Sequence, residues 1–122
     1  MNGYNFVADT NILIKLGQGN GQIADLLQDN NIFISFITEM EILAWPQHTP
    51  AEIVSAKTMI SQFSVVSLSE KIKDEAIRIR RYTKIKLPDA IIASTALYLK
   101  IPLLISDAGF KRVEKLIDVM LI

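Results

Sequence analysis

The sequence predicts an α/β fold, in which a central parallel sheet of about five short strands is covered by helices on both faces. Short β-prone runs alternate with helical stretches along the chain, and several of those stretches begin with clear helix-start signals. Half of the 122 residues are apolar, which is enough for one domain to bury a core without disulfides. We therefore expect a single α/β/α domain over residues 1–122.

Five runs of β-prone residues are the expected strands, and Asp9 ends the first of them. They cover residues 4–8, 32–36, 65–68, 102–105 and 119–122. Strands that alternate with helices form βαβ units, whose strands lie parallel in one sheet. The carboxyl ends of these strands should therefore meet at a common edge.

The clearest helix start lies at Thr49. Threonine is a favoured N-cap, Pro50 follows at the first helical position, and Glu52 stands three residues after the cap. This pattern is a capping box, in which each side chain accepts a hydrogen bond from the other residue's backbone. It predicts a helix over residues 50–63.

Two further helices follow along the chain. Ser69 is the expected N-cap of the first, in which Ile72, Ala76 and Ile79 keep the spacing of one apolar face. Pro88 opens the second, which should reach about residue 100. Both would pack against the sheet.

Composition excludes several functional classes. The chain has no cysteine, which excludes disulfide frameworks, thiolate zinc sites and cysteine nucleophiles. Its apolar runs are far shorter than the roughly 20 residues needed to cross a membrane. The first lysine is Lys15 and an aspartate precedes it, so no secretory signal is expected and the protein should be cytoplasmic. Thirteen basic residues balance thirteen acidic ones, so any contact with RNA requires a local patch or a metal ion.

Four carboxylates fall at the expected carboxyl edge of the sheet. Asp9 ends the first strand, Glu41 lies about one turn into the helix after the second, Asp89 lies in the first turn of the helix before the fourth, and Asp107 follows the fourth. Ligands of open parallel sheets bind at this edge. An acid at a helix start also stabilises the helix dipole without any ligand, and for Asp89 alone that interpretation stays open.

Four acids at one edge are unfavourable unless cations offset their charge, so the cluster predicts a metal site. With oxygen ligands alone, the metal should be a hard cation, Mg²⁺ or Mn²⁺, bound as one or two ions. The single histidine, His48, precedes a helix cap and is interpreted as a solvated loop residue. Trp45 is interpreted as packing at a helix end.

Four segments in order resemble the PIN-domain family, and within it the VapC-like toxins of type II toxin–antitoxin pairs. The segments are FVADTNILI at 6–14, ISFITEMEIL at 34–43, LPDAIIASTA at 87–96 and LLISDAGF at 103–110. The resemblance extends over the whole chain. It implies a three-layer α/β/α fold and metal-dependent cleavage of RNA. It also implies a homodimer and a cognate antitoxin that inserts a peptide into a groove.

The resemblance also suggests a role for each acid. Asp9 and Asp89 would bind the metal directly, Asp107 directly or through water, and Glu41 would bind it or orient the attacking water. These four are the expected catalytic and metal-binding residues, whose bound ions would activate a water and neutralise charge on the leaving oxygen. The hydroxyl and amide groups of two neighbours, Asn11 and Ser106, would support the metal ligands by hydrogen bonding.

Two positions depart from the family pattern. Ile105 stands where a threonine or serine usually lies two residues before the last acid, so Ser106 is left to supply a hydroxyl. Ala108 and Gly109 follow Asp107, where charged residues are common in the family. Weaker metal binding is the expected consequence.

The only concentrated basic segment covers residues 80–86. Its four basic residues are Arg80, Arg81, Lys84 and Lys86. They could follow a phosphate backbone, since such contacts supply most nonspecific affinity for nucleic acids. Charge runs also occur on solvated surfaces, so both interpretations stay open.

Two rival enzyme classes are disfavoured by the residues present, and one non-enzyme function stays open. A haloacid-dehalogenase-like phosphatase requires a second aspartate two residues after the first, where this chain has Asn11. A phosphoacceptor receiver domain would need paired acids before the first helix. A PIN-like module that binds RNA or protein without cleaving it stays open as the alternative to a magnesium- or manganese-dependent ribonuclease.

Overall fold

The computed structural model describes residues 3–106 and 108–122. Within them the chain forms five strands, six α-helices and one 3₁₀ helix. In chain order these are β1 (Asn5–Ala8), α1 (Thr10–Gly17), α2 (Gly21–Gln28), β2 (Asn31–Ser35), α3 (Phe36–Leu43), α4 (Pro50–Ile60), β3 (Ser64–Val66), α5 (Glu70–Thr83), α6 (Leu87–Leu99), β4 (Leu103–Ile105), η1 (Ala108–Val113) and β5 (Val119–Leu121).

The strands form one parallel sheet in the order β3-β2-β1-β4-β5, as the alternation of strands and helices predicted. From β1 the chain adds β2 and β3 on one side, then crosses over to add β4 and β5 on the other. The order therefore reverses between β1 and β4. In open parallel sheets this switch point opens a crevice at the carboxyl ends of the strands, where ligands bind. Asp9 follows β1 and Ser106 follows β4 at this point.

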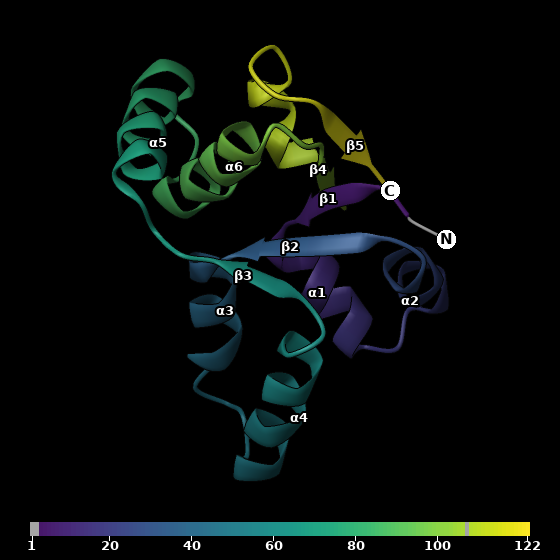
Figure 1. Ribbon diagram of the computed structural model, residues 1–122. Helices are drawn as coiled ribbons and strands as arrows, with labels where there is room; N and C mark the ends of the chain where they lie inside the picture. The colour runs from purple at the N-terminus through teal and green to yellow at the C-terminus, as the bar shows by residue number, and fades with distance from the viewer. Residues whose placement is uncertain (1–2, 107) are drawn as a thin grey trace.

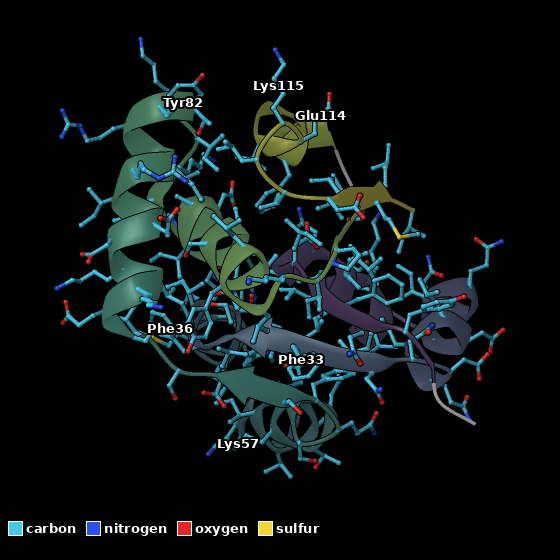
Figure 2. The ribbon with its side chains drawn as sticks, turned by 45° about the horizontal axis from the view of Figure 1, so that its top comes forward. Phe33, Phe36, Lys57, Tyr82, Glu114 and Lys115 are labelled. Carbon is cyan, nitrogen blue, oxygen red and sulfur yellow. The ribbon has the colours of Figure 1, made fainter. Side chains whose placement is uncertain are left out.

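Helices cover both faces of the sheet (Figure 1), so the predicted α/β/α layering is confirmed. Helices α1, α3 and α4 lie on one face, and α5, α6 and η1 lie on the other. Figure 2 labels Tyr82 near the end of α5. Buried side chains of α5 and α6 pack together with those of β1 and β4. Each face of the sheet therefore has its own hydrophobic core.

Alternating side chains of the central strands separate the two cores. On β1, Val7 packs with the α5 and α6 core, whereas Phe6 and Ala8 pack with the core beneath α1 to α4. On β4, Ile105 packs toward α6 and Leu104 packs toward α1. Successive side chains of a strand point to opposite faces, so a strand covered on both sides must be apolar throughout.

Strand and helix boundaries differ from the predicted ones by a few residues. The second strand ends at Ser35, and Phe36 already begins α3, because the Ser35 hydroxyl accepts a hydrogen bond from the Ile37 backbone N at 3.2 Å and caps the helix. Figure 2 marks Phe36 at this transition. The third strand ends at Val66, before the predicted residue 68, and α4 ends at Ile60 rather than at residue 63.

The predicted helix starts are confirmed. The Thr49 backbone N donates to Glu52 Oε1 at 2.9 Å, and the Glu52 backbone N donates to Thr49 Oγ1 at 3.2 Å, which completes the capping box of α4. The Ser69 hydroxyl accepts a hydrogen bond from the Ile72 backbone N at the start of α5. Helix α6 begins at Leu87, one residue before the predicted start.

In the described part of the chain, every helix is too short or too polar to span a bilayer.

Candidate metal centre

Asp9 is fixed at the carboxyl end of β1, in the centre of the sheet. Its backbone N donates to the carbonyl of Leu104 at 3.1 Å, so the end of β4 lies directly beside it. Its side chain is fully buried, and Oδ1 accepts a hydrogen bond from the Ile12 backbone N at 2.9 Å. Asp9 is thus the N-cap of α1 and places a carboxylate at the topological switch point.

Glu41 reaches the same edge of the sheet from α3. Its Oε1 lies 2.7 Å from the hydroxyl of Thr10, the residue that follows Asp9 in the chain. The Thr10 hydroxyl also lies 3.1 Å from that of Thr38, one turn before Glu41 on α3. The Glu41 side chain is solvent-exposed, so water has access to its carboxylate. The hydrogen bond brings the Glu41 carboxylate to the first turn of α1.

Asp89 lies in the first turn of α6 and is half-buried. The N-cap of that helix is Lys86, whose side chain makes no capping hydrogen bond. An acid at this position is favourably placed toward the backbone N–H groups and the positive end of the helix dipole. Helix α6, which carries Asp89 in its first turn, packs against α3, which carries Glu41, and against β1, which Asp9 follows.

The remaining predicted residues lie around the ends of β1 and β4. Asn11 is exposed in the first turn of α1, and Ser106 is half-buried directly after β4. The predicted acid Asp107 lies outside the described residues. Ile105, which stands in place of a hydroxyl residue, is fully buried in the core on the α6 side of the sheet. The hydroxyl residue of the fourth motif is therefore Ser106, one residue after Ile105, the position at which the family pattern has a threonine or serine.

The donor set is chemically suited to a hard cation. Asp9, Glu41 and Asp89 offer carboxylate oxygens only, and Mg²⁺ and Mn²⁺ prefer such ligands. Over residues 3–106 and 108–122, no three acidic or histidine side chains are grouped closely enough to hold a metal ion. Asp107, the fourth acid of the predicted set, lies outside this range.

An apolar groove of about 760 Å³ adjoins Glu41 and runs between α1, α3 and α4. Its lining is mostly apolar, with Glu41 and Glu52 as the acidic residues. The lining residues are Leu13, Ile14, Leu16, Gly17, Gln18, Glu41, Ile42, Trp45, His48, Glu52, Ser55, Ala56, Met59 and Gln62. Of the predicted acids that the structure describes, Glu41 alone also lines this groove.

The interpretation of Trp45 was wrong, and that of His48 was right in part, since His48 lies in the loop before the cap as predicted. Trp45 does not pack at a helix end: α3 ends at Leu43, and Trp45 lies beyond it, 59% exposed, in the connection to α4. His48 is half-buried rather than solvated, with Nε2 3.1 Å from the carbonyl oxygen of Ile42. This contact holds the connection against the end of α3.

The predicted basic segment divides between a helix end and a loop. Arg80 and Arg81 lie in the last turn of α5, Lys84 is its C-cap, and Lys86 is the N-cap of α6, three residues before Asp89. All four are exposed. Arg81 also borders a shallow depression of about 430 Å³ on the outer side of α5, and none of Asp9, Glu41 and Asp89 is in its lining.

Sequence reasoning missed the hydrogen bonds that link Thr10, Thr38 and Glu41, although all three residues lie in the motifs used for the resemblance. Thr38 and Glu41 are three residues apart, a spacing that places them on one face of a helix. Thr10 directly follows the first acid. The missing information was the distance between α1 and α3, which only the fold supplies.

Comparison with known proteins agrees with this architecture. The family model described as the PIN domain matches residues 6–116. A toxin–antitoxin complex from Klebsiella pneumoniae contains a chain of 28% identity, with a TM-score of 0.80 and coverage of 93% of this chain and 94% of that one. No protein of curated function matches the sequence.

Two more distant structures share the fold. One is VapBC2 from Rickettsia felis bound to a DNA fragment from its promoter, with 18% identity, a TM-score of 0.80 and coverage of 97% and 98%. The other is VapBC-1 from nontypeable Haemophilus influenzae, with 22% identity, a TM-score of 0.78 and coverage of 96% and 97%. The family model covers all of the sheet except β1's first residue and β5. The chain belongs to the PIN-domain family.

Proposed function

We propose that the protein is a metal-dependent endoribonuclease that hydrolyses RNA phosphodiester bonds, and that it acts as the toxin of a type II toxin–antitoxin pair. The observation that carries this proposal is the Thr10–Glu41 hydrogen bond, which joins the second predicted acid to the residue beside the first. Membership of the PIN-domain family and the similarity to a chain of a toxin–antitoxin complex support it.

In this proposal Asp9, Glu41, Asp89 and Asp107 hold one or two Mg²⁺ or Mn²⁺ ions. A bound divalent cation supplies activation of a water molecule and neutralises charge on the scissile phosphate. Asp9 and Asp89 serve as direct ligands, and Asp107 binds directly or through water. Burial of Asp9 and its fixed hydrogen bond to Ile12 give it a single orientation.

Glu41 has the exposure required of a group that handles water. It binds the metal or accepts a hydrogen bond from the attacking water and thereby orients it. Asn11 and Ser106 support the ligands through hydrogen bonds at the ends of β1 and β4. Each role belongs to a residue of one of the four motifs.

The nuclease activity is tested by cleavage of a mixed single-stranded RNA by purified protein in Mg²⁺, in Mn²⁺ and in EDTA. We expect cleavage with either metal, no cleavage in EDTA, and loss of cleavage in Asp9→Asn and Asp89→Asn. Asp25→Asn, an exposed acid of α2, is the matched control and should retain activity. If the wild type and both variants fail to cleave RNA and the wild type binds no Mn²⁺, the protein is a binding module instead of a nuclease.

For the substrate we propose phosphate contacts from the basic residues at the α5–α6 connection, Lys84 and Lys86 above all, because Lys86 precedes Asp89 by three residues. Loss of both lysines should weaken binding of single-stranded RNA. The slope of log affinity against log salt should become shallower by about 1.4, at about 0.7 per contact. Lys57→Ala, on α4 (Figure 2), is the control and should leave the slope unchanged. An unchanged slope in the double variant would refute the contacts.

For the partner we propose a cognate antitoxin whose apolar segment occupies the groove between α1, α3 and α4. Ile14 and Trp45 line this groove and are 45% and 59% exposed, a large apolar surface for a free protein. Since Glu41 lines the same groove, a cationic side chain of the partner would pair with the candidate metal centre.

The groove is tested with Ile14→Asp and with Val54→Asp, a control on α4 that is 65% exposed and lies outside the groove lining. Both variants should cleave RNA and arrest growth when expressed alone. Co-expressed antitoxin should relieve the arrest caused by Val54→Asp but not that caused by Ile14→Asp. Relief of both variants to the same degree would place the partner elsewhere.

We also propose a homodimer, as the family resemblance implies. Sedimentation of the purified protein should give twice the chain mass at micromolar concentration. A monomer with full cleavage activity would contradict this assembly.

A further inference from the structure

Two threonine hydroxyls and the Glu41 carboxylate form a short hydrogen-bonded series between α1 and α3. Thr10 Oγ1 lies 2.7 Å from Glu41 Oε1 and 3.1 Å from Thr38 Oγ1. The side chain of Thr38 is fully buried, that of Thr10 is half-buried and that of Glu41 is exposed. The series therefore leads from the core of the protein to the edge where the predicted acids lie.

The direction of the hydrogen bonds follows from the number of protons. A hydroxyl carries one proton, and an ionised carboxylate only accepts. The 2.7 Å contact therefore has the Thr10 hydroxyl as its donor. Since that proton is then used, the 3.1 Å contact must have Thr38 as donor and Thr10 as acceptor. Each hydroxyl polarises the next toward the carboxylate.

Packing sets the starting point of the series. A β-branched threonine has few accessible χ1 rotamers, and a fully buried one is held by its neighbours. Glu41 has three rotatable bonds and an exposed side chain, so α3 alone does not determine where its carboxylate lies. The hydrogen bond from Thr10 restricts the carboxylate to the first turn of α1, whose N-cap is Asp9.

We propose that Thr10 and Thr38 are positioning residues for Glu41, which they hold in the orientation that binds a divalent cation together with Asp9. This inference rests on the proposed function, because it assigns the two hydroxyls to the same metal centre. Removal of a group that orients a metal ligand commonly weakens metal affinity by about 10- to 100-fold. Thr10, which contacts Glu41 directly, has the larger effect.

The experiment measures Mn²⁺ dissociation constants by electron paramagnetic resonance for Thr10→Val, Thr10→Ser, Thr38→Val and Thr38→Ser. Valine keeps the shape of threonine and removes the hydroxyl, whereas serine keeps the hydroxyl. We expect about 10- to 100-fold weaker binding in Thr10→Val, a smaller loss in Thr38→Val, and near wild-type affinity in both serine variants. Thr58→Val, which removes a hydroxyl bonded to the carbonyl of Val54 on α4, should have no effect.

A double variant separates positioning from a general structural role. In a Glu41→Ala background, Thr10→Val should cause no further loss of Mn²⁺ affinity, since the carboxylate that it orients is absent. The ¹³C chemical shift of the Glu41 carboxyl in metal-free protein should change in Thr10→Val and return to its wild-type value in Thr10→Ser. This second readout does not depend on metal or on cleavage.

The outcomes distinguish this inference from the proposed function. Wild-type protein that binds Mn²⁺ with the same affinity as Thr10→Val overturns the positioning role and leaves the nuclease proposal intact. The positioning role is also overturned if Thr10→Val weakens Mn²⁺ binding by the same factor in the Glu41→Ala background as in the wild type. The wild type could bind no Mn²⁺ while Thr10→Val still changes the ¹³C chemical shift of the Glu41 carboxyl. That result overturns the metal centre, and with it the role of the two threonines in positioning a metal ligand.

Discussion

Asp9 has two roles that substitution can separate. Its carboxylate caps α1 through a hydrogen bond of 2.9 Å from the Ile12 backbone N to Oδ1, and it is also proposed to bind metal. Asparagine offers the same acceptor oxygen without the charge, and it is as good an N-cap as aspartate. Alanine offers neither. Asp9→Asn should therefore remove the metal ligand alone, whereas Asp9→Ala should remove both functions.

The expected magnitudes follow from this geometry. Loss of the cap in Asp9→Ala should lower the free energy of unfolding by about 0.5–2 kcal/mol in EDTA. Asp9→Asn removes the favourable interaction of the negative charge with the helix dipole, which is about 0.3–1 kcal/mol. It also removes the cost of a fully buried charge, which acts in the opposite direction. The free energy of unfolding in EDTA should therefore change by less than about 1 kcal/mol. Mn²⁺ at 100 times its dissociation constant should stabilise the wild type by about 2.7 kcal/mol.

The assay is urea unfolding of the wild type, Asp9→Asn and Asp9→Ala, each in EDTA and in Mn²⁺. We expect the wild type alone to gain stability from the metal. Equal stabilisation of Asp9→Asn by Mn²⁺ would refute its role as a ligand. A loss in Asp9→Asn as large as that in Asp9→Ala, measured in EDTA, would refute the role of Oδ1 as the cap.

Three further predictions concern stability. Leu104→Ala removes a fully buried side chain of β4 and should lower the free energy of unfolding by about 2–5 kcal/mol in urea; a loss below about 1 kcal/mol would contradict the described packing. Lys100 has a φ of 59°, so Lys100→Gly should raise stability by up to about 1 kcal/mol in thermal unfolding, while Lys100→Ala, which keeps the Cβ, should not. The Thr49 backbone N–H and then its hydroxyl hold the pKa of Glu52 below its ordinary value of 4.5. A carboxyl group whose pKa is lower in the folded state stabilises that state fully at pH values above its unfolded-state pKa. This stabilisation is lost as the pH falls through the folded-state pKa. The difference in melting temperature between wild type and Glu52→Gln should thus shrink below about pH 4.5, and a constant difference would exclude this linkage.

Local signals in the sequence predicted the order and type of most elements. The capping box at Thr49 and the cap at Ser69 act within four residues, so they can be recognised without knowing the fold. Alternating strands and helices predicted a parallel sheet, because a parallel pair needs a crossover connection. The boundary at Ser35 was missed since the strand-prone Phe36 follows it, and the capping hydrogen bond of Ser35 decides the outcome.

The candidate site was predictable only where topology determines position. Asp9 follows a strand, so its place at the sheet edge follows from the fold class. The contact between Thr10 and Glu41 joins residues 31 positions apart and depends on how α1 packs beside α3, which no local pattern encodes. Trp45 was misplaced for the same reason: its exposure depends on where α3 ends.

The central claim is that four acids from separate elements form one metal site. The most direct test is a crystal structure of the wild-type protein with Mn²⁺, in which anomalous scattering locates the ion. We predict a peak coordinated by the carboxylates of Asp9 and Asp89, with Glu41 and Asp107 bound directly or through water. A peak elsewhere, or no peak at saturating Mn²⁺ with these acids ordered, would contradict the account.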